Sequence, residues 1–159
     1  WAMTGWRIGV AAGPKAILSA MKNLQSHTTA NATAVAQMAA KAAFEGPLDF
    51  LDTWRAAFDA RRRRMVAALR AIPDVVCPEP LGAFYVFPDV GAYLGRRLGD
   101  LMMDSAATLA EMLLEHAHVA VVPGDDFGAS RCIRLSYACS LDDVNCGMDR
   151  IAAFLSQLT

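Results

Sequence analysis

The stretch from Leu48 to Ile72 constrains the fold more than any other part of this sequence. Its large apolar side chains recur at helical spacing and share one face: Leu51, Trp54, Phe58, Met65, Leu69 and Ile72. Pro73 then ends the pattern, because a residue before proline is disfavoured in a helix. The pattern predicts one amphipathic helix of about seven turns. We expect this long helix to connect two subdomains.

Shorter elements are predicted before this helix. The apolar run from Trp6 to Ala12 predicts a buried strand, and Pro14 to Gln25 repeats apolar residues at helical spacing. A polar stretch from Ser26 to Thr33 predicts a loop, and the alanine-rich run from Thr33 to Phe44 predicts a second helix. The first part of the chain is therefore expected to contain one strand and two helices.

After Pro73 the apolar pattern changes from helical spacing to short runs of strand-forming residues. Strands are predicted first, then a helix around Leu109, then two more strands and a last helix. The predicted ranges are strands at Val75–Cys77, Ala83–Phe87, Val119–Val122 and Ile133–Tyr137, and a final helix at Leu141–Leu158. The order of elements indicates an α/β fold without internal repeats.

Composition excludes several classes of function. The chain has 159 residues, of which 55% are apolar, so it can bury one substantial core. A net charge of -1 gives no overall field that favours nucleic acid or an anionic membrane. No apolar run approaches the roughly 18 residues of a membrane span, and no secretory leader is visible. The first residue is Trp1 rather than Met, so we expect the N-terminus to be cut.

Three clusters of polar residues favour ordinary structural interpretations. The four cysteines include no C-x-x-C pair, which predicts reduced thiols in a cytoplasmic protein and no metal site. Successive helical residues point to different sides, so Arg61 to Arg64 predict a solvated helix surface rather than a nucleic-acid stripe. His116 and His118 are poorly spaced for a metal pair, and histidine at a helix C-terminus commonly has a capping role.

Two arginines in apolar surroundings are candidates for binding an anion. Arg134 lies inside the run Ile133–Tyr137, where an unpaired buried charge would be costly. Its partner could equally be a structural carboxylate or a substrate carboxylate, which a guanidinium binds in a bidentate manner. Arg7 lies in the predicted first strand beside glycines, and phosphate is one candidate partner. The turn-rich segment Pro123–Gly128 is either a simple connection or part of a site.

Several segments resemble fold-type I pyridoxal-phosphate-dependent aminotransferases of class I and II, and among them the bacterial aspartate aminotransferases. They occur in the order and at the intervals of that family, and together they cover essentially the whole chain. The segments are Met3–Gly9 (MTGWRIG), Gln25–Gln37 (QSHTTANATAVAQ), Gly82–Phe87 (GAFYVF), Val121–Gly128 (VVPGDDFG) and Ile133–Ala138 (IRLSYA). The chain departs from the family's usual pattern at Val10, where an aromatic residue is frequent, and at Ala32, where proline is common.

The resemblance implies roles for particular residues. By it, Arg134 holds the α-carboxylate of the amino-acid substrate, Arg7 pairs with the phosphate of pyridoxal 5'-phosphate, and Phe84 lines the substrate entrance. The loop from Ser26 to Thr33 would lie at the interface of a homodimer. The family's Schiff-base lysine falls eight residues before Arg7, just upstream of Trp1, so no catalytic residue is assigned within this chain.

The resemblance also implies a domain arrangement and an activity. Residues 1–46 would be the end of the large cofactor-binding domain, residues 47–72 the connecting helix, and residues 73–159 the small C-terminal α/β sandwich domain. The intact parent protein would transfer an amino group from an amino acid, aspartate in particular, to a 2-oxo acid. This chain alone would be inactive. Its Leu51–Trp54–Phe58 face and the strand from Trp1 to Ala12 would have lost their partners, so we expect dimerisation or aggregation. Two alternatives remain: a carbon–sulfur lyase, and the aminotransferase-like ligand-binding domain of a transcription regulator.

Overall fold

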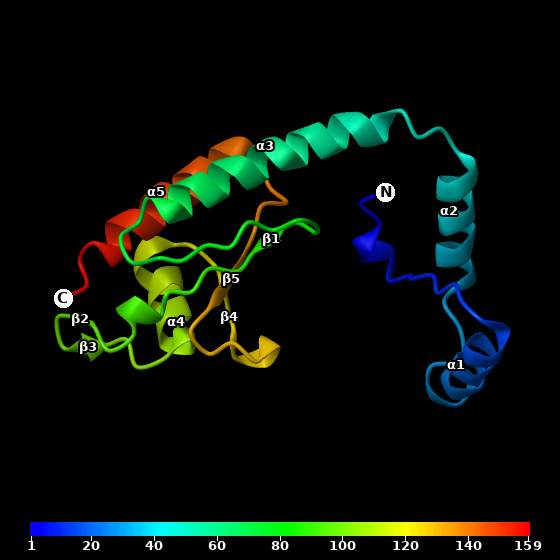
Figure 1. Ribbon diagram of the computed structural model, residues 1–159, viewed down its shortest axis with the longest axis horizontal. Coiled ribbons are helices and arrows are strands. Elements are labelled where there is room, and N and C mark those ends of the chain that lie inside the picture. The colour runs from blue at the N-terminus through cyan, green and yellow to red at the C-terminus, as the bar shows by residue number, and fades with distance from the viewer. The chain divides into compact units, whose positions relative to one another are not determined.

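The computed structural model describes residues 1–159, and the chain divides inside its longest helix into two compact units (Figure 1). Unit 1 comprises Trp1–Thr53 and unit 2 comprises Trp54–Thr159. That longest helix, α3, spans Phe50–Arg70 and confirms the helix predicted from the apolar face. No helix in the chain is both long enough and apolar enough to cross a bilayer.

Unit 1 is helical. A 3-10 turn, η1, spans Thr4–Trp6, and it is followed by helix α1 at Lys15–Thr28 and helix α2 at Ala34–Glu45. Thr33 begins α2, because its hydroxyl accepts a hydrogen bond from the Ala36 backbone N–H at 3.3 Å. Both helices predicted in this part of the chain are therefore confirmed.

Two predictions in unit 1 are wrong. The expected strand from Trp6 to Ala12 does not form, since unit 1 contains no other strand to accept its backbone hydrogen bonds. The predicted loop begins only after Thr28, because hydroxyls near the end of α1 bond back to its carbonyl groups. The Ser26 hydroxyl donates to the Asn23 carbonyl oxygen at 2.7 Å, and the Thr28 hydroxyl donates to the Leu24 carbonyl oxygen at 3.2 Å.

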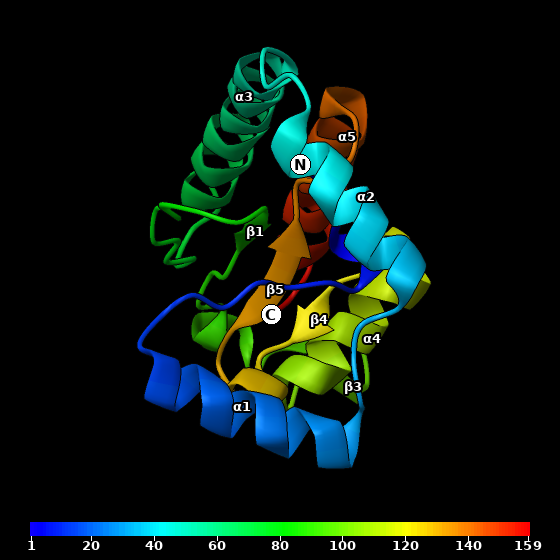
Figure 2. The ribbon, with the colours of Figure 1, turned by 90° about the vertical axis from the view of Figure 1, so that its right-hand side faces the viewer.

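Unit 2 contains a small antiparallel sheet with the strand order β1–β5–β4 (Figure 2). Strand β1 is Tyr85–Val86, β5 is Ile133–Ser136 and β4 is Val122–Pro123. Val86 is opposite Leu135 on one side of β5, and Val122 is opposite Arg134 on the other. The predicted strand at Val75–Cys77 is reduced to a single bridge between Val76 and Asp89.

The remaining elements of unit 2 are helices and a second hairpin. Helix α4 spans Ala106–Ala117 and α5 spans Leu141–Leu155, as the apolar spacing predicts. Three short elements were not predicted: the hairpin of β2 (Arg97–Leu98) and β3 (Leu101–Met102), the 3-10 turn η2 (Gly91–Tyr93), and the 3-10 turn η3 (Asp125–Phe127).

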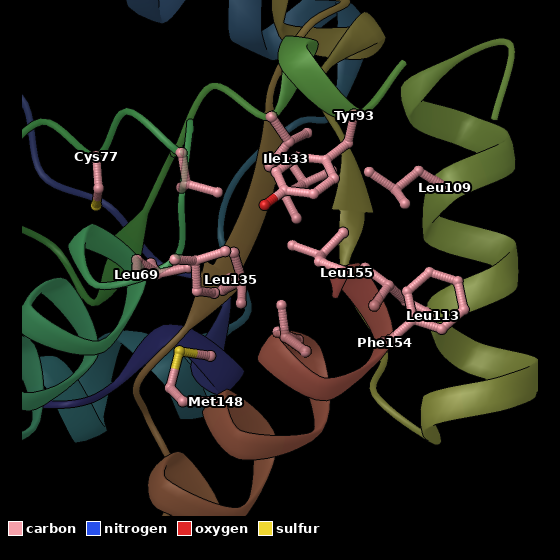
Figure 3. Packing of buried hydrophobic residues seen from close by; sticks show 14 of the residues in the cluster. Leu69, Cys77, Tyr93, Leu109, Leu113, Ile133, Leu135, Met148, Phe154 and Leu155 are labelled. Atoms are coloured by element: carbon pink, nitrogen blue, oxygen red, sulfur yellow. The ribbon is translucent and has the colours of Figure 1, made fainter. Parts of the chain in front are cut away.

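One hydrophobic core joins these elements of unit 2 (Figure 3). The helices and strand β5 contribute side chains that are almost completely buried, among them Leu69 from α3, Leu113 from α4, Ile133 from β5 and Leu155 from α5. Because β5 alternates, Ile133 and Leu135 face this core while the residues between and after them face the other way. The core thus fixes the strand that carries Arg134.

Candidate functional site

Arg134 lies on the face of β5 that is turned away from the core. Its neighbours Ile133 and Leu135 are buried, whereas Arg134 itself is half-buried and Ser136 is exposed. The prediction of a guanidinium enclosed within an apolar strand is therefore wrong, because alternation gives the strand one apolar face and one polar face. The charge stays partly in contact with solvent.

Two aromatic rings enclose the Arg134 guanidinium. Its central carbon lies 4.5 Å from the ring centroid of Tyr85 in β1 and 4.5 Å from that of Phe127 in η3. Such distances are typical of cation–π contacts. None of the ion pairs in the structure involves Arg134. The sequence allowed a structural carboxylate as the partner of Arg134, and this chain supplies none. The rings of Tyr85 and Phe127 contact the guanidinium instead.

The turn that carries Phe127 is held by two glycines. A side-chain carbon at Gly124 would lie 2.2 Å from the Ala129 carbonyl oxygen, so only glycine fits there without a shift of backbone. Gly128 ends η3 with φ 72°, a left-handed conformation that favours glycine. The Gly124 N–H donates to the Cys132 carbonyl oxygen at 2.8 Å, which ties the turn to the start of β5. The segment Pro123–Gly128 therefore shapes the surroundings of Arg134.

Phe84 belongs to the same aromatic group. Its ring lies 4.3 Å from that of Tyr85, with 42° between the planes. Its carbonyl oxygen accepts a hydrogen bond from the Tyr137 N–H at 2.9 Å, and the Tyr137 hydroxyl donates to the Ala83 carbonyl oxygen at 3.0 Å. Phe84 is thus fixed beside the ring that covers Arg134, and its role in lining a substrate entrance stays a prediction.

Arg7 is placed differently from the expectation. It is exposed, follows η1 rather than lying in a strand, and has a left-handed backbone with φ 53°. One guanidinium nitrogen donates to the Thr4 carbonyl oxygen at 3.1 Å, and no carboxylate pairs with the side chain. Its remaining N–H groups can therefore donate hydrogen bonds to a phosphate, and to this extent Arg7 fits the phosphate end of pyridoxal phosphate.

A cavity of about 320 Å³ lies near Arg7 in unit 1. Its walls are mainly apolar and are formed by the N-terminal segment and α2, with Trp1, Ile8, Val10 and Phe44 among them. Trp1 is fixed by a hydrogen bond from its indole N–H to the Ala43 carbonyl oxygen at 2.9 Å. These walls contain no lysine and no carboxylate, so the cavity itself offers no group for acid–base chemistry.

The run Arg61–Arg64 is not uniformly solvated, and the prediction is wrong for Arg62. That side chain is only 19% exposed and forms ion pairs with Asp59, at 2.7 Å, and with Glu79. The hydrogen bonds from Arg62 hold the pKa of the Asp59 and Glu79 carboxyl groups below their usual values. Arg64 donates to the Asn145 side chain at 2.6 Å. These arginines therefore connect α3 to neighbouring elements of unit 2.

The four cysteines differ in their burial. Cys77 is buried, Cys132 and Cys139 are half-buried and Cys146 is exposed, and all four thiols are free. Burial raises the pKa of the Cys77 thiol above its ordinary value. No group of three His, Cys, Asp or Glu side chains is arranged to hold a metal ion. The four thiols therefore form no common site.

Sequence reasoning missed the two rings that cover Arg134. Tyr85 directly follows Phe84 in the segment Gly82–Phe87, and Phe127 lies in the turn Pro123–Gly128. Both aromatic residues lie in segments that also contain glycine. Which ring would reach the guanidinium, however, depends on the pairing of β1, β4 and β5. That pairing is a property of the fold.

Comparison with known proteins shows a family that matches most of this chain. The family described as "Aminotransferase class I and II" matches residues 1–151. An aspartate aminotransferase of Streptomyces avermitilis is 47% identical over 99% of this chain and 38% of its own length. An aspartate/prephenate aminotransferase of Cereibacter sphaeroides is 42% identical over 100% of this chain and 40% of its own length.

Solved structures show the same likeness in three dimensions. The crystal structure of the aspartate aminotransferase from Rhizobium meliloti superposes with a TM-score of 0.85 and 40% identity, over 99% of this chain and 40% of that one. The aspartate aminotransferase from Thermus thermophilus with maleate gives a TM-score of 0.77 and 37% identity, over 96% of this chain and 38% of that one. The chain thus spans about two fifths of the length of these relatives. Over that part, it shares their mixed helix and sheet architecture.

Proposed function

This chain belongs to the aminotransferase class I and II family, and from that premise we propose that the longer protein containing it transfers an amino group from an amino acid to a 2-oxo acid. Arg134 carries the proposal. Its guanidinium is held on the outer face of β5, has no protein carboxylate as a partner, and exposes N–H groups that match a carboxylate. Both substrates of a transamination have a carboxylate at the reacting carbon, so one arginine can orient either of them.

Pyridoxal 5'-phosphate is the cofactor that the family implies, and it supplies an electron sink for the bonds at the substrate α-carbon. In this chain Arg7 would pair with its phosphate. A lysine eight residues before Arg7 would hold the cofactor and move the proton at the α-carbon. Arg134 would fix the substrate carboxylate and thereby align the α-hydrogen for removal.

We propose aspartate as the amino donor. Relatives named aspartate aminotransferase include proteins at 47% and 46% identity, and the names of two relatives also include prephenate. One relative was solved with maleate, which is a dicarboxylate. Product analysis with aspartate, a broader panel of amino acids and a cysteine-type substrate would separate this activity from that of a carbon–sulfur lyase.

The first experiment uses the longer protein encoded by the reading frame upstream of Trp1. If a cofactor-binding portion with the expected lysine precedes this chain, purified protein with pyridoxal phosphate should convert aspartate and 2-oxoglutarate. Arg134→Gln should lower kcat/KM by about 30-fold to several thousand-fold, the range for removing one partner of a charge pair that ligand binding would desolvate. A reading frame that encodes a helix-turn-helix protein instead would favour the transcription-regulator alternative.

Arg131→Gln is the matched control for Arg134→Gln. Arg131 lies three residues earlier in the same segment, but it is exposed and pairs with Asp89 at 3.2 Å. Its loss should leave kcat/KM within about twofold, as expected for a solvent-exposed ion pair. Equal losses in the two variants would contradict a specific carboxylate role for Arg134.

We also propose that the 159-residue chain is inactive by itself, that the longer protein is a homodimer, and that it works in the cytoplasm with reduced thiols. Unit 1 supports association, because large apolar residues on its helices are exposed, among them Ile17, Leu24 and Met38. Sedimentation of the chain over a range of concentrations would test association. A monomer at every concentration, or transamination by the chain alone, would contradict these proposals.

A further inference from the structure

We infer that Tyr85 and Phe127 are positioning residues, which form an aromatic clamp that sets the orientation of the Arg134 guanidinium for carboxylate binding. The inference rests on the proposed function, since it concerns the same arginine. The clamp is defined by three side chains from three elements: Tyr85 of β1, Arg134 of β5 and Phe127 of η3.

The contacts of Arg134 leave the N–H donors of its guanidinium available to a ligand. The two rings lie at equal distances of 4.5 Å from its central carbon. The faces of a guanidinium are weak hydrogen-bonding surfaces, whereas its edges carry all five N–H donors. The rings lie against the guanidinium without accepting its N–H groups in any hydrogen bond, so these donors remain for a planar, bidentate carboxylate.

No hydrogen bond or ion pair of the protein directs the Arg134 side chain, so the rings are the contacts that orient it. Arg96 provides the comparison within unit 2. Its guanidinium also lies 4.5 Å from an aromatic ring, that of Tyr93. Arg96, however, donates to the Ala92 carbonyl oxygen at 3.0 Å and to the Asp74 carboxylate at 3.3 Å. Protein groups satisfy the edge of Arg96, whereas the edge of Arg134 remains free.

The rings of the clamp are themselves held by further rings. Tyr85 contacts Phe84 at 4.3 Å, and Phe127 meets Phe87 edge to face at 5.9 Å with 85° between the planes. Gly124 and Gly128 fix the turn beneath Phe127. Such aromatic pairs prefer tilted and edge-to-face geometry, so each outer ring limits the motion of an inner one.

The test compares Phe127→Leu and Tyr85→Leu with the wild-type longer protein. Each variant keeps an apolar side chain but removes one ring face. Because a cation–π contact is worth a factor of about two to thirty in an equilibrium constant, KM for both amino acid and 2-oxo acid should rise by that factor. The effect on kcat should be smaller than the effect on KM. Phe127→Tyr and Tyr85→Phe restore a ring and should restore the wild-type KM.

A double-mutant cycle with Arg134→Gln separates positioning from general damage to the fold. In the Arg134→Gln background, Phe127→Leu should have no further effect on KM, because no guanidinium remains to be oriented. If the loss is the same in both backgrounds, or if KM is unchanged in the ring variants while Arg134→Gln raises it, the clamp inference is overturned.

Nuclear magnetic resonance of the 159-residue chain gives a second readout without catalysis. The Arg134 Nε–H resonance should be shifted upfield by the two ring currents, and Phe127→Leu should remove part of that shift. An unshifted resonance in the wild-type chain would overturn the inference. If Arg134→Gln itself leaves KM unchanged, the proposed function fails and the carboxylate role of the clamp fails with it, although the ring-current shift would still be seen.

Discussion

Unit 1 and unit 2 are both rich in helix, but only unit 2 has a core. Ala36 is the single apolar residue of unit 1 that is buried, whereas all the other buried apolar residues lie in unit 2. Helices α1 and α2 have apolar residues at helical spacing just as α4 and α5 do. The difference shows that an amphipathic pattern predicts a helix and its apolar face. It does not predict which part of the protein will bury that face.

The two candidate arginines repeat this difference. Arg134 is positioned by a sheet that rests on the core of unit 2, and two rings fix its guanidinium. Arg7 lies in unit 1 after a single 3-10 turn, and it is exposed with one hydrogen bond to Thr4. The position of a site residue thus depends on whether a hydrophobic core holds the backbone that carries it.

Hydrogen exchange of the 159-residue chain should show the largest contrast between the units. Backbone amides of α4 and β5 should exchange with opening free energies near that of global unfolding, about 5 kcal/mol or more for a typical domain. Amides of α1 should exchange with opening free energies of about 1 kcal/mol or less, since its helix has no buried residue. Equal protection of α1 and α4 would show that unit 1 has a core after all.

Truncation of leucine to alanine should lower the free energy of unfolding more in unit 2 than in unit 1, and this contrast should be smaller than that in hydrogen exchange. Leu113 in α4 is fully buried, and Leu113→Ala should lower the free energy of unfolding by about 2–5 kcal/mol through lost contacts and a cavity. Leu24 in α1 is 69% exposed, so Leu24→Ala should change it by about 0.5 kcal/mol or less. Urea denaturation followed by circular dichroism measures both.

Leu114→Ala is the control for that comparison. Leu114 is the next residue of the same helix as Leu113 but is 54% exposed. Its truncation should resemble that of Leu24, which would show that burial rather than membership of a unit decides the loss. A loss as large as that of Leu113→Ala would contradict this explanation.

Much of the fold was predictable from the sequence. The helices α1, α2, α3, α4 and α5 follow from apolar spacing and from capping residues such as Thr33, because these signals are local. The strand expected at Trp6–Ala12 failed because a strand needs a partner, and that partner is not local. For the same reason the segment Val75–Cys77 was overestimated, since one bridge from Val76 to Asp89 is all the pairing that forms.

The candidate site was predictable only in part. A charged residue between the apolar residues Ile133 and Leu135 is enough to identify Arg134 as a candidate. The sequence could not show that the rings of Tyr85 and Phe127 would both contact it, since Tyr85 is brought there by the pairing of β1 with β5 and Phe127 by the turn η3. Nor could it show that Arg134 lies on the outer face, because the apolar run around it concealed the alternation of β5.

Glycine substitutions should change stability in opposite directions at two positions of unit 2. At Gly124 a methyl group would lie 2.2 Å from the Ala129 carbonyl oxygen and 2.7 Å from that of Cys132, so Gly124→Ala should be destabilising by about 1–3 kcal/mol. At Gly147 in α5 nothing lies within 4 Å, so Gly147→Ala should be stabilising by about 0.5–1 kcal/mol. Thermal unfolding of the two variants tests both signs.

The same pair also probes the link between fold and site. Gly124→Ala should move the turn and with it Phe127, so the ring-current shift at Arg134 should decrease. Gly147→Ala, far from the turn in sequence and in a regular helix, should leave that shift unchanged. An unaltered Arg134 resonance in Gly124→Ala would mean that the turn does not position Phe127.

Lowering the pH should produce the smallest change in stability. The group responsible, Asp89, contacts the segment that leads into β5. Asp89 accepts hydrogen bonds from the Gly91 N–H at 2.7 Å and from Arg131, which hold the pKa of its carboxyl group below the ordinary value of 3.8. Since the folded pKa is the lower one, this stabilisation is complete above about pH 3.8 and is lost as the pH falls through the folded pKa. Asp89→Asn should therefore flatten the fall in the urea midpoint that the wild-type chain shows as the pH drops below about 3.8. The backbone hydrogen bond from Gly91 is the larger cause, so Arg131→Gln should leave most of that fall in place. If Arg131→Gln removed all of it, the ion pair rather than the turn would be what stabilises this end of unit 2.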